Sequence, residues 1–121
     1  MLNEKSRFYG KTKLISIAAL KNVFNAKLFD YLDIVILFGS RALETSHERS
    51  DYDFAVTSKQ VDCDWGVMSQ VWIDIGDKLG LDEVDYDVID LDIATLEMKA
   101  SVKKGYIVLK GNEDDISRIL G

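Results

Sequence analysis

A chain of 121 residues, 47% hydrophobic and 30% charged, has the composition of a protein with one hydrophobic core and excludes the disordered and membrane-spanning classes. Its net charge of −6 disfavours direct nucleic-acid binding, which depends on Lys and Arg at phosphates, and favours a basic protein partner or a cationic small molecule. With one cysteine, no leader pattern and no apolar run long enough to span a membrane, the sequence predicts a single cytoplasmic domain over residues 1–121.

Hydrophobic periodicity predicts the first elements. An amphipathic helix is expected over residues 11–29, where the apolar positions at helical spacing are Leu14, Ile17, Ala18, Phe24 and Leu28. The nearly uninterrupted apolar run at 32–38 predicts a strand buried on both faces, although a buried helix has the same pattern. A polar loop follows, and residues 52–57 predict a second strand.

The second half alternates in the same way. A helix is predicted over 64–79, with Gly80 as its left-handed cap and with an apolar stripe of Trp65, Met68, Trp72, Ile75 and Leu79. Residues 84–91 predict a third strand, and Asp92 is expected to cap a helix that ends at Gly105. A strand at 106–110 and a helix at 114–120 complete an α/β (α+β) chain, a small sheet with helices packed on it.

The stretch that carries chemistry joins the first two strands. Gly39 and Ser40 end the first strand; ten residues later come Asp51 and Asp53. Glycine lets a triphosphate approach the backbone, and amides after Ser40 form an anion cradle if a helical turn starts there. Two carboxylates two positions apart on a strand share one face and suit Mg²⁺. The alternative is a plain Gly-Ser turn followed by two solvated carboxylates.

This pattern resembles the nucleotidyltransferase signature of the DNA polymerase β superfamily. The segment LFGSRALETSHERSDYDFAV is similar to the superfamily's smallest branch, the minimal nucleotidyltransferases (MNT), and the likeness runs from about Tyr31 to Lys110. The resemblance implies a mixed sheet flanked by helices, ATP as donor and two Mg²⁺ ions at three carboxylates. It also implies that Asp51, Asp53 and a third carboxylate are both catalytic and metal-binding.

The third carboxylate belongs, by the resemblance, to an acidic-aliphatic-aliphatic-Asp-Leu pattern on the neighbouring strand. The segment DVIDL fits this pattern and assigns Asp87, with Asp85, which has the same strand parity, as the alternative. Asp90 points to the other face and is expected to serve helix entry.

Cationic and aromatic side chains near the signature have less specific roles. Gly39, Ser40 and Arg41 are expected to bind the nucleotide, with Arg41 as a cation for the triphosphate; Arg49 is a weaker candidate and a solvated arginine is the alternative for both. His47 is expected to be solvated. Core packing is expected for Trp65 and Trp72, with adenine stacking as the alternative, and no role is assigned to Cys63.

Two classes of function remain open. MNT proteins are antitoxins paired with HEPN-domain toxins, and some adenylylate a tyrosine on the toxin; the resemblance therefore implies a protein adenylyltransferase with a HEPN partner. The chain has little room for an acceptor-binding lobe of its own. The first alternative is an antitoxin that neutralises its partner by binding alone. The second is a small-molecule nucleotidyltransferase, of the aminoglycoside type, whose acceptor is held by another subunit.

Overall fold

The computed structural model describes residues 7–8, 11–43 and 50–121. Two short 3₁₀ turns, Lys27–Phe29 and Leu91–Ile93, accompany the longer elements. Those elements are, in chain order, β1 Arg7–Phe8, β2 Lys11–Thr12, α1 Ile17–Phe24, β3 Ile34–Phe38, β4 Tyr52–Thr57, α2 Trp65–Leu79, β5 Tyr86–Asp90, α3 Leu96–Lys103, β6 Tyr106–Lys110 and α4 Glu113–Leu120. Within these ranges no helix has the length and apolar character needed to cross a bilayer.

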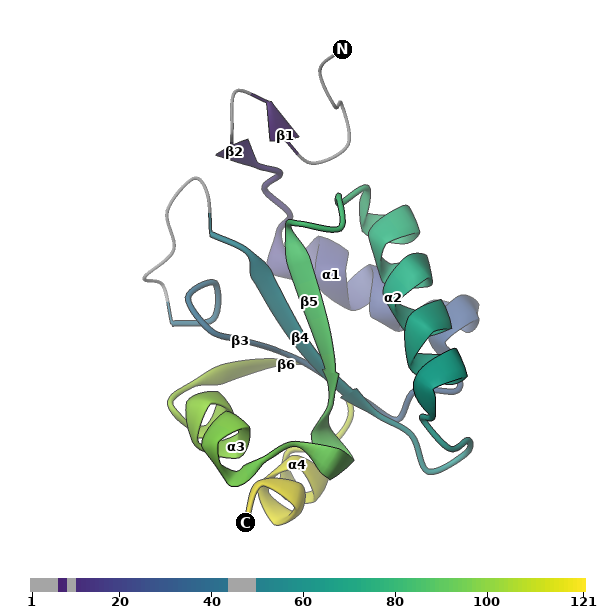
Figure 1. Cartoon of the computed structure of the whole chain (residues 1–121), viewed down its shortest axis with the longest axis vertical. Helices are drawn as coiled ribbons and strands as arrows, with labels where there is room; N and C mark the ends of the chain where they lie inside the picture. Colours follow the sequence, from purple (N-terminus) through teal and green to yellow (C-terminus); the bar gives the residue numbers. More distant parts are fainter. Residues whose placement is uncertain (1–6, 9–10, 44–49) are drawn as a thin grey trace.

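Four strands form one mixed sheet in the order β5-β4-β3-β6 (Figure 1). The central strand β3 runs antiparallel to β4 and to β6, whereas β4 and β5 run parallel and are connected through α2. The small mixed sheet and its flanking helices confirm the predicted α+β class. The sequence did not predict β1 and β2, which form a separate antiparallel pair.

Helices cover both faces of the sheet. One apolar cluster lies between the sheet and the α1–α2 layer, and a second lies on the other face beneath α3 and α4 (Figure 1). Every residue of β3 is buried, because its side chains enter the two clusters alternately. This confirms the predicted strand with two buried faces and rejects the alternative of a buried helix.

Capping residues explain where α2 begins and ends. The Asp64 side chain accepts a hydrogen bond from the Val67 amide, and Gly80 ends the helix at φ 68°. The predicted cap is therefore confirmed. The predicted stripe is correct for Ile75 and Leu79, which are buried, but wrong for Trp65, which is 85% exposed because it lies in the first turn, at the end of the helix.

The predicted helix at 11–29 is too long. Ser16 caps α1 through the Ala19 amide and Asn25 ends it, so the regular helix covers only eight residues. Leu14 lies before the cap and is 79% exposed, and a separate 3₁₀ turn places Phe29 in the core. Local caps thus override a periodicity that extended across them.

The predicted cap of the next helix is also wrong. Asp90 caps a 3₁₀ turn by accepting from the Asp92 amide, which agrees with its expected role in helix entry. Thr95, and not Asp92, caps α3 through the Met98 amide. The Thr57 hydroxyl instead donates a hydrogen bond to the Asp92 carboxylate.

Candidate active site

The site begins where β3 leaves the sheet. Gly39 has φ 74°, a conformation that strongly favours glycine, and its carbonyl accepts hydrogen bonds from the Ala42 and Leu43 amides, both at 3.1 Å. A helical turn therefore starts at the Gly-Ser pair, as the anion-cradle interpretation requires. Ser40, half-buried, is the first residue of this turn.

Gly39 also leaves room for a carboxylate. Phe38 of β3 pairs with Asp53 of β4, which brings the strand exit against that side chain. A Cβ added at Gly39 would overlap the Asp53 carboxylate and would lie 3.3 Å from its Cγ. The backbone turn and the carboxylate thus fit together only with glycine at this position.

Asp53 and Asp87 are direct neighbours across the parallel strand pair. They are register partners in β4 and β5, so their side chains leave the sheet from the same face. Ala55 and Ile89, two positions further along each strand, belong to the apolar cluster beneath α3 and α4. The two carboxylates therefore point to the α3–α4 face.

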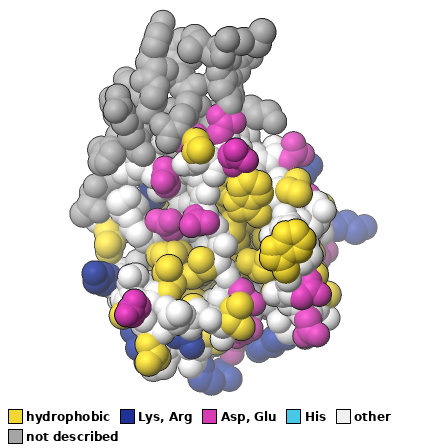
Figure 2. Space-filling view, in the orientation of Figure 1, with side chains coloured by type: hydrophobic (Ala, Val, Ile, Leu, Met, Phe, Trp, Pro, Cys, Tyr) yellow, Lys and Arg dark blue, Asp and Glu magenta, His cyan; other side chains and the backbone are white. Residues whose placement is uncertain are grey.

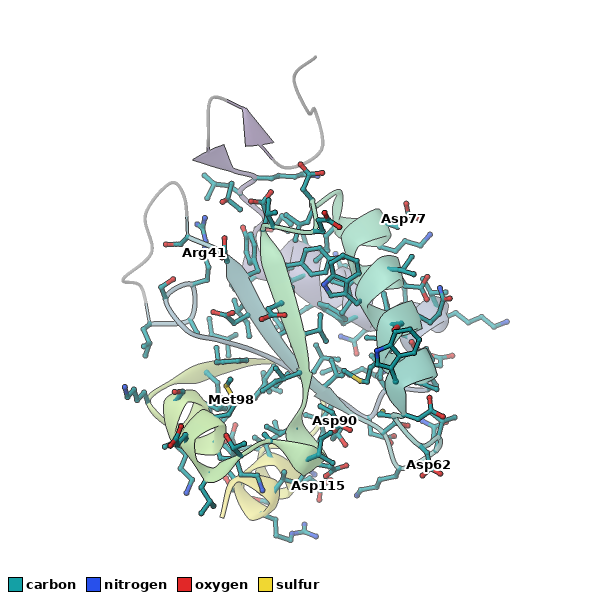
Figure 3. The ribbon with its side chains drawn as sticks, in the orientation of Figure 1. Arg41, Asp62, Asp77, Asp90, Met98 and Asp115 are labelled. Carbon is teal, nitrogen blue, oxygen red and sulfur yellow. The ribbon has the colours of Figure 1, made fainter. Side chains whose placement is uncertain are left out.

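A cavity of about 310 Å³ opens at these carboxylates. Two of the residues that line it, Met98 and Ser101, belong to α3, and Met98 lies toward the sheet (Figure 3). The lining residues are Phe38, Gly39, Asp53, Phe54, Asp87, Ile89, Met98 and Ser101. Met98 and Ser101 could not be predicted from the sequence, because their only signal is a one-turn spacing on a helix that could face either way.

Asp53 is a half-buried carboxylate with other carboxylates nearby. Burial, then the charge of Asp87 and then that of Asp51, raise the pKa of Asp53 to about 6. A divalent cation would relieve that repulsion, and hard carboxylate oxygens beside a space for phosphate suit Mg²⁺. Among the described residues no three His, Cys, Asp or Glu side chains already form a metal cage. The donor set fits a metal that takes one or two carboxylates and completes its shell with substrate oxygens.

Asp51 lies just before β4, where Arg41 holds the backbone. The Arg41 guanidinium donates through Nε and Nη2 to the Ser50 carbonyl, at 3.1 and 2.8 Å, and lies 4.9 Å from the centre of the Tyr52 ring (Figure 3). The Tyr52 hydroxyl donates to the Lys13 carbonyl and accepts from the Ile15 amide, both at 2.9 Å. Arg41 therefore ties the Gly-Ser turn to the segment that carries Asp51.

The other candidate residues differ in burial and in the face of the sheet on which they lie. Asp85 is completely buried before β5, and its carbonyl accepts from the Tyr52 amide at 3.0 Å, whereas Asp87 is exposed. Trp72 is half-buried and stacks on Tyr86, on the α2 side of the sheet. The expectations for His47 and Arg49 lie outside the described residues.

The raised pKa of Asp53 predicts a pH-dependent stability. Because the folded protein binds this proton more tightly than the unfolded chain, the free energy of unfolding of the metal-free protein falls as pH rises from about 4 to about 6. Asp53→Asn should remove this loss and stabilise the metal-free protein at pH 7.5 by about 1–2 kcal/mol, a figure reduced for solvent screening.

Urea unfolding in EDTA at pH 4.5 and 7.5 measures the difference, with Asp62→Asn as the exposed-carboxylate control. Asp62→Asn should leave stability nearly unchanged at both values. Equal stability of Asp53→Asn and wild type at pH 7.5 would contradict the assigned repulsion.

The residues of the site lie within one family match. The family model described as "Polymerase beta, Nucleotidyltransferase" matches residues 18–115, which include β3 to β6 and every carboxylate discussed above. No curated protein matches the chain significantly.

Several solved structures are similar in fold. A chain of a toxin–antitoxin complex with AMP-PNP is 22% identical, with a TM-score of 0.67, and the match covers 88% of this chain and 82% of that one. A chain of the MntA–HepT toxin–antitoxin complex is 19% identical, with a TM-score of 0.58, and the match covers 86% of this chain and 77% of that one. A chain of a complex of a tri-AMPylated Shewanella oneidensis HEPN toxin with MNT antitoxin is 20% identical, with a TM-score of 0.59. That match covers 87% of this chain and 81% of the other.

Proposed function

This chain belongs to the polymerase β nucleotidyltransferase family, and on that premise we propose that it transfers AMP from ATP to a hydroxyl of a companion protein. The observation that carries the proposal is the register pairing of Asp53 with Asp87 beside the Gly39 turn. The pairing supports the proposal because a triphosphate bound at the backbone amides of the turn would lie beside both carboxylates.

Different residues of the site bind the triphosphate, position Asp51 and hold metal. The turn at Gly39 and Ser40 binds the triphosphate, and Arg41 holds the segment that carries Asp51. Asp51, Asp53 and Asp87 would hold two Mg²⁺ ions, which when bound neutralise phosphate charge and acidify the acceptor hydroxyl.

Transfer is a displacement at the α-phosphorus. The acceptor oxygen forms a bond to this atom, the bond to the β-phosphate oxygen breaks, and pyrophosphate leaves. Asp87, which is exposed at the mouth of the cavity, takes the acceptor proton.

The companion we propose is a HEPN-type toxin, modified on a tyrosine hydroxyl and thereby inactivated. Two findings support this choice: the similar fold of the antitoxin that is complexed with a tri-AMPylated HEPN toxin, and a net charge of −6, which favours a basic partner. An added AMP would block the toxin's site by bulk and by negative charge.

The test is co-expression with the protein encoded next to this chain, followed by intact-mass spectrometry. We expect additions of AMP mass to the partner that disappear with Asp53→Ala. A partner that stays unmodified, yet is still neutralised by Asp53→Ala, would replace the enzyme by an antitoxin that acts through binding alone.

A second prediction separates the candidate third carboxylates. If Asp87 serves the acceptor, Asp87→Asn should keep ATP affinity within a few-fold and lose transfer. Asp85→Asn should have a much milder effect on transfer, because Asp85 is completely buried outside the cavity. ATP titration and single-turnover transfer measure the two quantities, and the reverse ranking would move the assignment to Asp85.

A further inference from the structure

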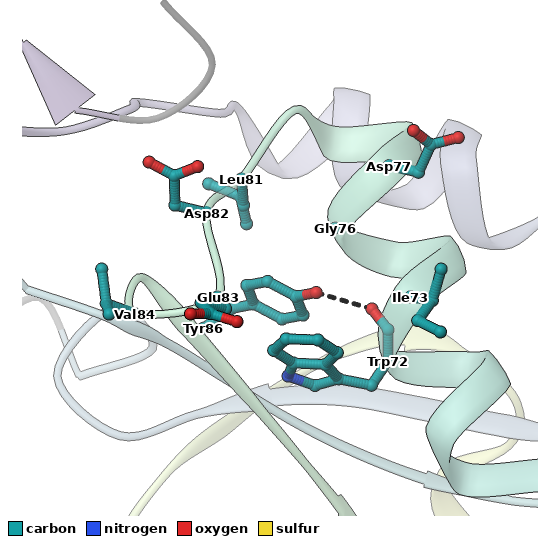
Figure 4. Close-up of a pocket in the computed structure, with 9 residues that line it drawn as sticks. All are labelled: Trp72, Ile73, Gly76, Asp77, Leu81, Asp82, Glu83, Val84 and Tyr86. Atoms are coloured by element: carbon teal, nitrogen blue, oxygen red, sulfur yellow. Dashed lines mark hydrogen bonds between the residues drawn. The ribbon is translucent and has the colours of Figure 1, made fainter. Parts of the chain in front are cut away.

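A second hollow lies on the other face of the sheet, between α2 and the turn that precedes β5 (Figure 4). It encloses about 520 Å³, more than the cavity at the carboxylates. We call it the α2–β5 shelf; its lining residues are Trp72, Ile73, Gly76, Asp77, Leu81, Asp82, Glu83, Val84 and Tyr86. None of the roles assigned above uses it.

Two stacked aromatic rings form the floor of the shelf. The centroids of Trp72 and Tyr86 are 5.0 Å apart at an interplanar angle of 18°, and the Tyr86 hydroxyl donates to the Trp72 carbonyl at 2.6 Å (Figure 4). A Cβ at Gly76 would overlap the Tyr86 hydroxyl, so the helix approaches the ring closely only with glycine there. The ring stack, the hydrogen bond and this close approach together define the floor.

The rim is acidic and apolar. It carries three carboxylates, Asp77, Asp82 and Glu83, and none of the described residues that line the shelf is Lys or Arg. The apolar side chains of Ile73 and Val84 are 53% and 60% exposed at the same rim. Figure 2 shows the same character on this face, where large hydrophobic side chains lie among acidic ones.

The exposed aromatic surface continues along the helix. Trp65 is 85% exposed and lies seven residues before Trp72, a spacing that returns to the same side of a helix after two turns. An exposed tryptophan is unusual for a surface that meets only water, and aromatic residues are enriched at the centres of protein interfaces.

We infer that the α2–β5 shelf docks an arginine-bearing segment of the companion protein. A guanidinium stacks on a tryptophan face and pairs with carboxylates, which matches a floor of Trp72 and a rim of three acids. The apolar rim suits the neighbouring aliphatic side chains of a peptide. Phosphate groups are repelled by the same rim, so nucleotides and nucleic acids are excluded.

The position of the shelf agrees with this use. Tyr86 and Asp87 are consecutive in β5, an outermost strand of the sheet, so their side chains leave by opposite faces. Because β5 is an edge strand, a partner anchored on the Tyr86 face can pass around this edge to reach the face that carries Asp87, the carboxylate that we propose accepts its proton. The inference rests on the proposed function in this respect, because it names where the acceptor protein is held.

The experiment uses the full chain and a dodecapeptide that alternates Arg and Ala, with a Glu-Ala peptide as the reference. We expect the Arg-Ala peptide to shift the indole resonance of Trp72 in ¹⁵N-labelled protein, and the Glu-Ala peptide to leave it unchanged. The double variant Asp77→Asn/Glu83→Gln should lower the affinity for the Arg-Ala peptide about tenfold. The matched control Asp62→Asn/Asp114→Asn changes the net charge by the same amount at exposed positions outside the shelf. It should lower the affinity for the peptide less than about threefold.

Three results would overturn the inference: an unshifted Trp72 resonance, equal weakening in both double variants, or the same shift at the same concentration with free spermidine. Failure here is distinguishable from failure of the proposed function. Asp53→Ala should bind the peptide as wild type does while losing AMP transfer. Peptide binding without transfer in wild type would reject the enzyme alone, and transfer without peptide binding would reject the shelf alone.

Discussion

Replacing Asp53 with alanine should lower AMP transfer by at least about 10³-fold, because the Mg²⁺ ions that we propose Asp51, Asp53 and Asp87 hold would supply most of the stabilisation of charge in the transition state. Asp51→Ala should do the same. Neither variant should unfold the protein: Asp51 is exposed, and loss of the Asp53 charge removes repulsion from Asp87.

Single-turnover transfer with radiolabelled ATP and Mg²⁺ measures this loss, and circular dichroism verifies the fold. Asp62→Ala, an exposed carboxylate outside the cavity, is the control and should transfer as wild type does. Near-wild-type transfer by Asp51→Ala or Asp53→Ala would show that the metal assignment is wrong.

Gly39→Ala should reduce transfer by at least about 100-fold and also lower the melting temperature. Alanine at φ 74° costs about 1–2 kcal/mol, and its Cβ overlaps the Asp53 carboxylate, which must then leave its position. One methyl group then displaces both the turn that we propose binds the triphosphate and a carboxylate that we propose holds metal, so a large effect on catalysis is expected.

A double variant separates the two causes. In Gly39→Ala/Asp53→Ala the overlap is gone, since the added Cβ would lie 3.5 Å from the Asp53 Cβ, an ordinary contact. Its melting temperature should therefore recover part of the loss, whereas the strain of the positive φ remains. Gly66→Ala is the control: it lies in the first turn of α2 with room for a methyl group and should be neutral or stabilising.

The strands were predictable because their signals are local. The boundaries of β4 and β6 agree with the predicted 52–57 and 106–110, and β3 lies within the predicted 32–38. Side-chain alternation, glycine at a strand end and two carboxylates at strand spacing depend only on neighbouring residues. Gly39, Ser40, Asp51 and Asp53 could therefore be chosen as the candidate site before any fold was known.

Helix limits were less predictable, since capping competes with periodicity. Ser16 and Thr95 each start a helix by accepting a backbone amide, and in both cases an apolar pattern or a nearby acid suggested another start. A capping hydrogen bond stabilises a helix by about 1 kcal/mol, so it can move the first residue of the helix. The sequence alone does not decide which of two nearby residues forms the cap.

The sequence by itself determined the α+β class, the Gly-Ser turn and the Asp51–Asp53 pair. Only the tertiary structure decided that Asp87 lies opposite Asp53, because the register of a parallel pair depends on how α2 carries the chain from one strand to the next. It likewise decided that Arg41 binds the Ser50 carbonyl and that Trp72 stacks on Tyr86 at the floor of a hollow with an acidic rim. These contacts join residues that no local pattern relates.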